Sequence, residues 1–238
     1  MCQERNVQVI RYEKNTGVAQ PLYDGIECAL SNNFKYVYTL DQDSVTAENT
    51  IDKLYEIISG NPQIAIAAVD HVPMAKDTDI KQTFGGGVRF VDKVITSGAL
   101  SDAKIIKEIG NYIPEMFIDW VDTEMCYRVE SQGYKIALTD EVLLVHNMGD
   151  PVQRKFLWTT CTTMNYSPFR LYHIWRNASY CFRKYKHNRK LIKRDKMELR
   201  HLKLKIILYE DNKFSKLKAI KKGRKDAGKF LKLLMEKR

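Results

Sequence analysis

Apolar residues recur along the chain in short blocks that alternate with amphipathic stretches. Residues 36–40 (YVYTL) and 64–69 (IAIAAV) are strand-length apolar runs, as expected for buried strands. Residues 18–30 and 46–59 carry apolar side chains at helical spacing, and Gly60-Asn61-Pro62 ends the second stretch. A further short strand is predicted at residues 7–10 (VQVI). This alternation predicts an α/β fold with a mostly parallel sheet flanked by helices.

The pattern is less regular after residue 70. Residues 84–95 predict a glycine-rich turn followed by an edge strand or hairpin, and residues 102–109 predict a short helix. Residues 117–133 predict a helix that opens in an acidic cluster, followed by strands at 134–138 and 141–146. From residue 168 onward the pattern is helical and increasingly basic. We therefore expect an α/β body in residues 1–165 and a helical, basic region in residues 166–238.

Charge is distributed unevenly along the 238 residues, whose net charge is +10. Residues 183–238 contain 22 Lys and Arg against 6 Asp and Glu, so the rest of the chain is acidic overall. An acidic body with a basic tail differs from a uniformly basic nucleic-acid-binding protein. The tail also spaces Leu and Ile as an amphipathic helix does, which favours an anionic membrane surface. A solvated helical face packed on the body is the alternative.

Cysteine usage and hydropathy indicate the cellular compartment of the protein. The five cysteines are scattered without CxxC or Cys/His spacing, so neither a zinc cage nor a disulfide framework is expected. No stretch approaches the roughly 20 apolar residues of a membrane-spanning helix, and the first 15 residues lack an apolar signal core. We expect a cytoplasmic protein with reduced thiols, peripheral at the inner face of the cell membrane if the tail binds lipid.

Asp41 and Asp43 directly follow the predicted strand at residues 36–40. Ligands of open α/β sheets bind beyond the carboxyl ends of the strands. Two carboxylates one residue apart can converge there on a hard divalent cation such as Mg²⁺ or Mn²⁺. An acidic pair after a strand is also typical of a plain turn and helix cap.

Three further features carry candidate chemistry. The cluster Asp119-Trp120-Val121-Asp122-Thr123-Glu124 stands at a predicted helix start, where the helix dipole alone favours acidic residues. Asp122 is the best candidate for a base that takes a proton from an acceptor hydroxyl. His146 ends a predicted strand and is either a loop residue or a metal or phosphate ligand. Ser97 and Gly98 offer small polar groups at a tight turn.

The order of these segments carries a family resemblance. NTGVAQPLYDG, YVYTLDQDS, ITSGAL, MFIDWVDTEMCYR and HNMGD follow one another as in family 2 glycosyltransferases of the GT-A (Rossmann-like) fold. Within that family the chain resembles bacterial rhamnosyltransferase-type enzymes that build surface polysaccharides. The resemblance covers about residues 7–185. It implies inverting, metal-assisted transfer of a sugar, with rhamnose as the expected sugar, from a dTDP- or UDP-sugar to a hydroxyl of a polysaccharide or lipid-linked acceptor.

The resemblance also implies roles for residues. Asp41 and Asp43 match the DxD motif that holds the metal and the donor diphosphate, with Asp43 the more direct ligand, and His146 matches a histidine that serves the same groups. Asp122 matches the general base, although Val121 and Glu124 depart from the usual pattern and leave Asp119 as an alternative base. Ser97 and Gly98 match the acceptor side, where Trp120 and Asp119 are also expected. A downstream Arg-Tyr-Arg-Asn element, expected near the diphosphate or the acceptor, is matched by Arg170, Tyr172, Arg176 and Asn177.

One departure from the family is large. Members normally open with a strand, a helix and a second strand that hold the base and ribose, whereas this sequence begins almost at the NTGVAQ element. We therefore expect at least one such unit, roughly 30 residues, to be missing from the sequence or supplied by another chain. An inactive remnant is one alternative to an active enzyme. A non-enzymatic protein that binds nucleic acid through its basic tail is another, and the absence of a reader motif makes nucleic acid an unexpected partner.

Overall fold

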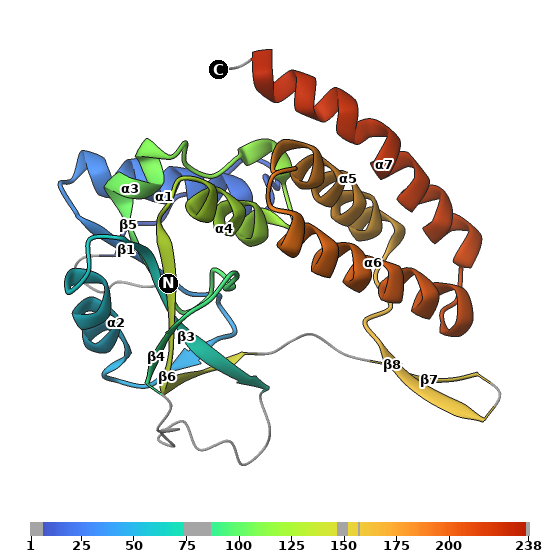
Figure 1. Cartoon of the computed structure of the whole chain (residues 1–238), viewed down its shortest axis with the longest axis horizontal. Coiled ribbons are helices and arrows are strands. Elements are labelled where there is room, and N and C mark those ends of the chain that lie inside the picture. The colour runs from blue at the N-terminus through green and yellow to red at the C-terminus, as the bar shows by residue number, and fades with distance from the viewer. Residues whose placement is uncertain (1–6, 74–86, 147–151, 157, 237–238) are drawn as a thin grey trace.

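The structure is a computed structural model that describes residues 7–73, 87–146, 152–156 and 158–236 (Figure 1). Helices surround a central sheet in the first part of the chain, and three longer helices pack together in the second part. The predicted α/β fold with flanking helices is confirmed.

The central sheet is mixed. Its strands are β1 (Tyr36–Thr39), β2 (Val45–Thr46), β3 (Ile64–Pro73), β4 (Val88–Phe90), β5 (Ala99–Asp102) and β6 (Lys135–His146). They lie in the order β1-β5-β3-β6-β2, with β4 also beside β6. β3 and β6 pair in parallel, and β5 pairs antiparallel with both β1 and β3. The strands β1, β3 and β6 thus share one direction, as the strand and helix alternation predicts, and the short β2, β4 and β5 run against them.

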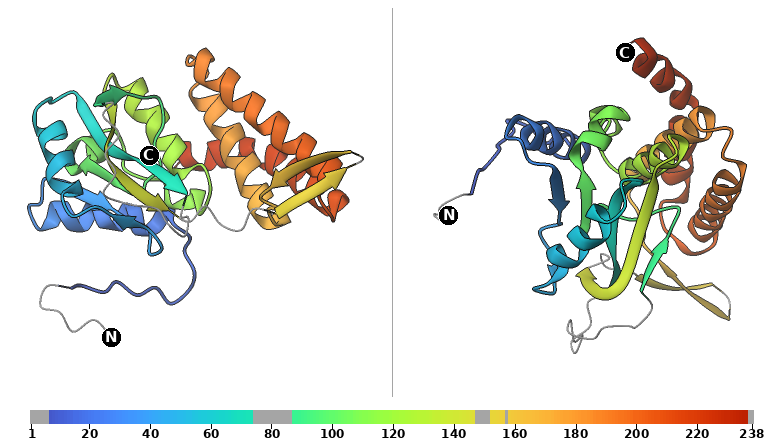
Figure 2. Two further views of the ribbon diagram at one scale, coloured as in Figure 1. Left: turned by 90° about the horizontal axis from the view of Figure 1, so that it is seen from below. Right: turned by 60° about the vertical axis from the view of Figure 1, so that its left-hand side comes forward.

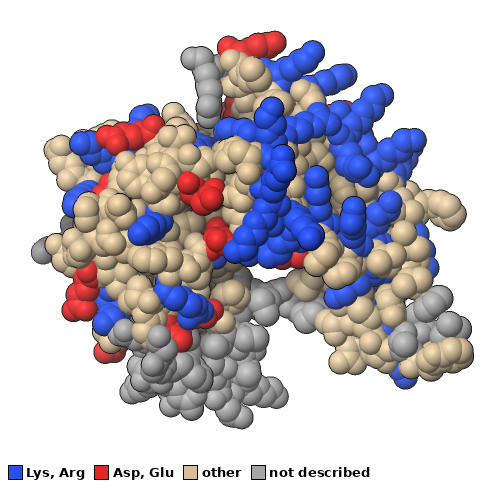
Figure 3. All heavy atoms as spheres, viewed as in Figure 1, with Lys and Arg blue, Asp and Glu red and all other residues tan. Residues whose placement is uncertain are grey.

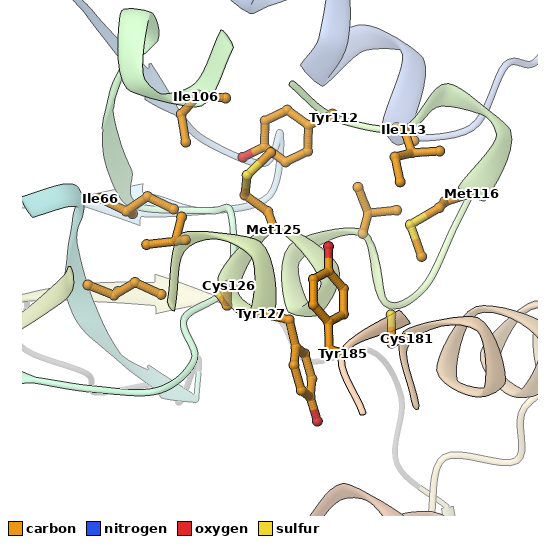
Figure 4. Close-up of a cluster of buried hydrophobic side chains, with 14 of the residues drawn as sticks. Ile66, Ile106, Tyr112, Ile113, Met116, Met125, Cys126, Tyr127, Cys181 and Tyr185 are labelled. Carbon is orange, nitrogen blue, oxygen red and sulfur yellow. The ribbon is translucent and has the colours of Figure 1, made fainter. Parts of the chain in front are cut away.

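Helices cover both faces of this sheet. They are α1 (Ala19–Ser31), α2 (Thr50–Ser59), α3 (Ala103–Glu108), the 3₁₀ turn η1 (Pro114–Met116) and α4 (Val121–Ser131). Side chains alternate between the two faces along a strand, so Ile66 of β3 packs in one core with α1, α3 and α4. Val69 lies in the other core, under Leu54 and Ile58 of α2. Figure 4 shows the first core, where Met125 and Cys126 of α4 lie among sheet and loop side chains.

One predicted strand is absent from the described structure, and the strand β5 of the structure has no counterpart among the sequence predictions. Residues 7–10 form no strand with any described residue, and Val9 is 63% exposed; Figure 2 shows the segment before α1 as an extended trace away from the sheet. An extended segment becomes a strand only when a neighbour accepts and donates its backbone hydrogen bonds. Conversely, β5 (ALSD) has little strand character, yet it is buried because β1 and β3 pair with it on both sides.

The second part of the chain consists of a β-hairpin and three helices. The hairpin is β7 (Val152–Phe156) and β8 (Thr159–Thr163), and the helices are α5 (Pro168–Lys184), α6 (Arg189–Tyr209) and α7 (Lys213–Glu236). α5 and α7 approach closely at Gly223, where a Cβ would lie 2.4 Å from the main-chain oxygen of Tyr172. Lys216 and Glu210 form a buried ion pair of 2.8 Å where α6 turns into α7.

The helical region also contacts the body. Tyr185, just after α5, stacks on Tyr127 of α4 with ring centroids 5.4 Å apart (Figure 4). Both rings belong to the same buried core as the sheet side chains. The boundary near residue 165 stays a prediction. Among the described residues, no helix is both long and apolar enough to cross a membrane.

Candidate functional site

The DxD segment forms a turn at the carboxyl end of β1. Asp41 and Asp43 are both exposed there. The buried hydroxyl of Ser97 accepts a hydrogen bond from the Asp41 main-chain nitrogen at 3.0 Å and donates one to Ser44 Oγ at 2.9 Å. The turn closes with a hydrogen bond of 3.1 Å from the Ser44 nitrogen to the Asp41 oxygen. Ser97 therefore fixes the backbone that presents the two carboxylates.

Pairing between β2 and β6 brings the backbone of His146 to the same edge of the sheet. Val45, two residues after Asp43, pairs with Val145, and His146 is the last residue of β6. The side chain of His146 and the Asn147-Met148-Gly149 segment lie outside the described residues. The structure thus brings together the backbones of the two predicted metal-binding segments, and the role of the imidazole stays a prediction.

Gly98 is required between the end of β1 and the middle of β3. Its φ is +76°, and a Cβ would lie 2.8 Å from Val69 Cγ2. Its nitrogen donates to the Thr39 oxygen at 2.8 Å, and its oxygen accepts from the Val69 nitrogen at 3.1 Å. Only glycine fits this backbone without strain. Ser97 and Gly98 therefore shape the DxD turn, and their predicted contact with an acceptor stays a prediction.

The loop between η1 and α4, which carries the predicted acidic cluster, has an unusual backbone. Phe117, Asp119 and Trp120 have φ of 65°, 60° and 66°. Non-glycine residues with positive φ are uncommon, and strained residues gather at functional sites. This backbone is also why the helix predicted from residue 117 begins only at Val121.

Asn177 of α5 holds this loop in place. The residue is fully buried, and its Nδ2 donates to the main-chain oxygens of Met116 at 3.0 Å, Ile118 at 3.0 Å and Asp119 at 2.7 Å. Its Oδ1 accepts from Arg176 Nε at 2.9 Å. The Asn177 side chain therefore donates to three main-chain carbonyl groups between Met116 and Asp119.

The NTG element contacts the same loop from the other side. The Phe117 oxygen accepts a hydrogen bond of 2.8 Å from the Val18 nitrogen at the start of α1. Gly17, with φ +74°, allows this approach, since a Cβ would lie 2.2 Å from that oxygen. Asn15 Oδ1 accepts from the Gly17 nitrogen at 2.8 Å. Two motifs that are 100 residues apart in sequence thus meet at one carbonyl group.

Asp119 and Trp120 point to different neighbours. Arg170 of α5 donates two hydrogen bonds, of 2.7 and 3.2 Å, to the Asp119 carboxylate. This bidentate geometry is the strongest for such pairs. Trp120 packs edge-on against Phe182 of α5, with centroids 5.5 Å apart. Because Arg170 already holds Asp119, Asp122 is the better placed of the two candidate bases.

Asp122 lies in the first turn of α4. One carboxylate oxygen accepts a hydrogen bond of 2.6 Å from the Thr123 nitrogen. The residue lines a small cavity together with Ile95, Thr96 and Tyr112. Burial raises the pKa of Asp122, while the Thr123 hydrogen bonds and Lys93 oppose that shift. A carboxylate with a raised pKa is a stronger base than a solvated one.

The carboxylate of Glu124, the third acid of the cluster, is held by neighbouring side chains. Its buried carboxylate forms an ion pair with Arg128, a second with Lys184 at 3.1 Å, and a hydrogen bond with Tyr185 Oη at 2.6 Å. Burial alone raises the pKa of Glu124, but Arg128, Lys184 and Tyr185 together outweigh it and hold the pKa below its usual range. Buried charges persist only when paired in this way.

The remaining members of the downstream basic element are also engaged. Arg176 donates to the main-chain oxygens of Glu115 at 2.9 Å and Met116 at 3.0 Å, and its guanidinium lies 4.2 Å from the Phe230 ring centroid. Tyr172 Oη donates to Asp226 at 3.2 Å. The structure thus gives Arg176 a contact with the strained loop and Tyr172 one with α7, and their contact with a diphosphate or an acceptor stays a prediction.

His173, which the sequence pattern does not single out, lies beneath the strained loop. Its ring stacks on Phe117 with centroids 5.4 Å apart and lies 4.7 Å from Phe169. Burial, with Arg176 nearby, lowers the pKa of His173 to about 4. A histidine inside a helical run of aromatic residues carries no sequence signal that separates it from ordinary core.

The Asp41 and Asp43 carboxylates can supply some of the ligands of a hard divalent cation. Two exposed carboxylates on a fixed turn can supply oxygen ligands, and water and phosphate oxygens commonly complete such shells. Within the described ranges, no group of three or more His, Cys, Asp or Glu side chains gathers to hold a metal by itself. Asp41 and Asp43 therefore fit a cation that is shared with a bound diphosphate rather than an all-protein metal cage.

Sequence comparisons relate the chain to known proteins. Residues 1–115 match the family model described as glycosyl transferase family 2. A dTDP-rhamnosyl transferase, RfbF of Shigella flexneri, is 27% identical over 192 residues, and the match covers 75% of this chain and 64% of that protein.

Solved structures share the fold. GalNAc-T7 with UDP, GalNAc and Mn²⁺ superposes with a TM-score of 0.52 at 13% identity, over 74% of this chain and 37% of that one. TarS residues 1–349 of S. aureus with UDP-GlcNAc superposes with a TM-score of 0.50 at 10% identity, over 74% and 50%. At these identities the likeness is one of fold. The similarity to the glycosyl transferase family 2 model spans residues 1–115, just under half of the chain.

Proposed function

We propose that the chain is part of a glycosyltransferase that moves a sugar from a nucleotide-diphosphate donor to a hydroxyl of a polysaccharide or lipid-linked acceptor, with inversion and with help from a divalent cation. The name of the 27% identical relative favours a dTDP-linked donor and rhamnose, and the nucleotides named with the solved structures favour UDP as the alternative. We place the reaction at the inner face of the cell membrane.

One observation carries the proposal. The segment of residues 94–97 touches both halves of the candidate site, since Ser97 bonds to the DxD turn and Thr96 lines the same cavity as Asp122. The turn that presents two exposed carboxylates and the half-buried Asp122 carboxylate with raised pKa therefore both border one short piece of chain. Such a pair suits a reaction that needs charge stabilisation at a leaving diphosphate and proton removal at a nucleophile.

Each residue has a part in that reaction. Asp41 and Asp43 would hold the cation, which when bound would neutralise charge on the nucleotide diphosphate. Asp122 takes the proton from the attacking acceptor hydroxyl. Asn177, Arg170 and Gly17 hold the loop that leads into Asp122, and Ser97 holds the turn that presents Asp43. Trp120 would form an apolar wall on the acceptor side.

Nucleotide binding tests the donor half. Thermal unfolding of the full chain is followed with UDP, dTDP and neither, each with and without Mn²⁺ or Mg²⁺. We expect a rise in Tm that needs both nucleotide and cation, because a ligand that binds only the folded state stabilises it by mass action. Asp43→Asn should abolish the rise, and Glu108→Gln, an exposed change on α3, should keep it. A chain that shows no such rise with either nucleotide contradicts the proposal and favours an inactive remnant.

Sugar transfer tests the base. Product formation from a dTDP- or UDP-sugar and a lipid-linked saccharide should disappear in Asp122→Asn, whereas the nucleotide-dependent rise in Tm should persist. Near-normal turnover of Asp122→Asn would refute its role and leave Asp119 as the base.

A further inference from the structure

A cationic groove runs across the three C-terminal helices. It consists of three adjoining hollows with volumes of about 400, 470 and 400 Å³. The first two share Lys196 and Arg200, and the last two share Lys203 and Arg224. The eight basic residues that line the groove are Lys186, Arg189, Lys193, Lys196, Arg200, Lys203, Lys221 and Arg224.

These eight basic side chains form no ion pairs with carboxylates of the described residues. All eight residues are exposed. Several basic residues elsewhere are paired, as Lys107 is with Glu27 and Arg170 with Asp119. Figure 3 shows Lys and Arg gathered over the helical region, with the acidic residues mostly on the body. Concentrated charge of one sign attracts a partner of opposite sign.

The groove also exposes apolar side chains. Along α6, Met197 and Ile207 line the hollows, Leu204 is exposed between them at helical spacing, and Met197 is 50% exposed. Phe182 and Leu217 line the hollows beneath them. Cations interspersed with exposed aliphatic side chains suit the headgroup and acyl boundary of a bilayer, whereas a nucleic acid is bound mainly by charge and by stacking on exposed aromatic rings.

The groove begins beside the candidate acceptor side. Phe182 lines its first hollow and packs against Trp120, which lies two residues before Asp122. A lipid whose phosphate rests in the groove would therefore hold an attached sugar close to Trp120. This last step rests on the proposed function.

We propose that the groove formed by α5, α6 and α7 docks the chain on an anionic phospholipid bilayer. Lys196, Arg200 and Arg224 contact lipid phosphates, and the exposed aliphatic residues of α6 enter the interface. The docked chain lies on the bilayer surface with the acceptor side of the site facing the lipid.

Vesicle co-sedimentation of the full chain tests this surface. We expect binding to vesicles of phosphatidylcholine with phosphatidylglycerol and none to phosphatidylcholine alone. The triple variant K196Q/R200Q/R224Q should bind about 100-fold more weakly, at about fivefold per basic residue near the bilayer. The matched control K218Q/K225Q/K232Q removes the same charge from exposed positions of α7 outside the groove, and it should bind within about threefold of the wild type.

Equal losses in the two triple variants would overturn the groove as the docking surface, because net charge would then explain the binding. Equal binding to both kinds of vesicle would also overturn it. Retention on duplex DNA that is stronger than on anionic vesicles, and that is lost in K196Q/R200Q/R224Q, would assign the groove to nucleic acid instead.

The nucleotide-dependent rise in Tm is measured on the same preparations. If it persists without vesicle binding, only the docking surface is wrong, and if it is absent while vesicles bind, only the proposed function is wrong.

Discussion

The side-chain amide of Asn177 donates a hydrogen bond of 2.7 Å to the main-chain oxygen of Asp119. The two residues are 58 positions apart, and the bond joins α5 of the helical region to the loop that leads into α4 of the body. The same nitrogen also donates to the oxygens of Met116 and Ile118. The strained backbone of the candidate site is therefore held in place by a residue outside the α/β body.

Asn177→Asp tests this link with almost no change in volume. A carboxylate cannot donate, so the three main-chain oxygens lose the hydrogen bonds from Asn177 and a charge is buried beside them. We expect the free energy of unfolding to fall by about 3 kcal/mol, measured by urea denaturation. Asn61→Asp is the control, since Asn61 only accepts from the Gln63 nitrogen and should stay within about 0.5 kcal/mol. Equal effects would mean that the donated bonds stabilise nothing.

Gly17→Ala tests the contact between the NTG element and the same loop. The new Cβ would lie 2.2 Å from the Phe117 oxygen at a φ of +74°, so the loop or α1 must shift. We expect a loss of about 2–4 kcal/mol in the free energy of unfolding, together with loss of the nucleotide-dependent rise in Tm. Gly25→Ala inside α1 is the control, because no heavy atom lies within 4 Å of its new Cβ. It should stabilise the chain by about 0.5–1 kcal/mol.

Ser97→Ala tests how the DxD turn is fixed. The substitution removes the hydrogen bonds to the Asp41 nitrogen and to Ser44. We expect a loss of about 1 kcal/mol in the free energy of unfolding and a weaker cation-dependent response to nucleotide, seen as a higher Kd in calorimetric titration. Ser59→Ala, which removes an exposed hydroxyl at the end of α2, should leave that Kd unchanged. If both variants bind nucleotide like the wild type, Ser97 does not position the turn.

Asp122→Asn tests the consequence of burying a carboxylate. Because burial raises the pKa of Asp122 in the folded state, its charge costs stability as pH rises through that pKa. Asp122→Asn should therefore be at least as stable as the wild type at pH 7, measured by thermal unfolding. An ordinary aspartate has a pKa of about 4. In the wild type, kcat/KM should therefore fall on the acid side with an apparent pKa above that value. An apparent pKa at or below that value, or a clearly destabilised Asp122→Asn, would contradict the assignment.

His173→Phe tests the lowered pKa beneath the loop. The folded state keeps His173 neutral down to about pH 4, whereas the unfolded chain takes up a proton near pH 6.5. Stability from this residue is thus complete above pH 6.5 and is lost as the pH falls toward 4. His173→Phe should shrink the difference in unfolding free energy between pH 7 and pH 4 by about 2–3 kcal/mol, at about 1.4 kcal/mol per pKa unit. His201→Phe, at an exposed position, should leave that difference unchanged.

Local patterns were sufficient to predict most elements and to place Asp41 and Asp43 directly after a strand. The strand before Asp41, the helices around the sheet and the helical tail all follow from hydrophobic spacing, because each buries one face or stripe whatever its neighbours are. The turn that carries Asp41 and Asp43 follows from its position at a strand end. The family resemblance from residues 7–185 rests on the same local segments.

Contacts distant in sequence decided the rest. Residues 7–10 have strand composition but remain exposed, since a strand needs a partner and no described residue provides one. β5 forms because β1 and β3 lie on either side of it, and the predicted helix start at residue 117 gives way to a loop that Asn177 and Gly17 hold at positive φ. By itself the sequence determined the kinds of element and the residues with candidate chemistry. Only the tertiary structure decided which carboxylates of the acidic cluster form ion pairs with distant residues, as Asp119 does with Arg170 and Glu124 with Lys184, because pairing and burial depend on groups far along the chain.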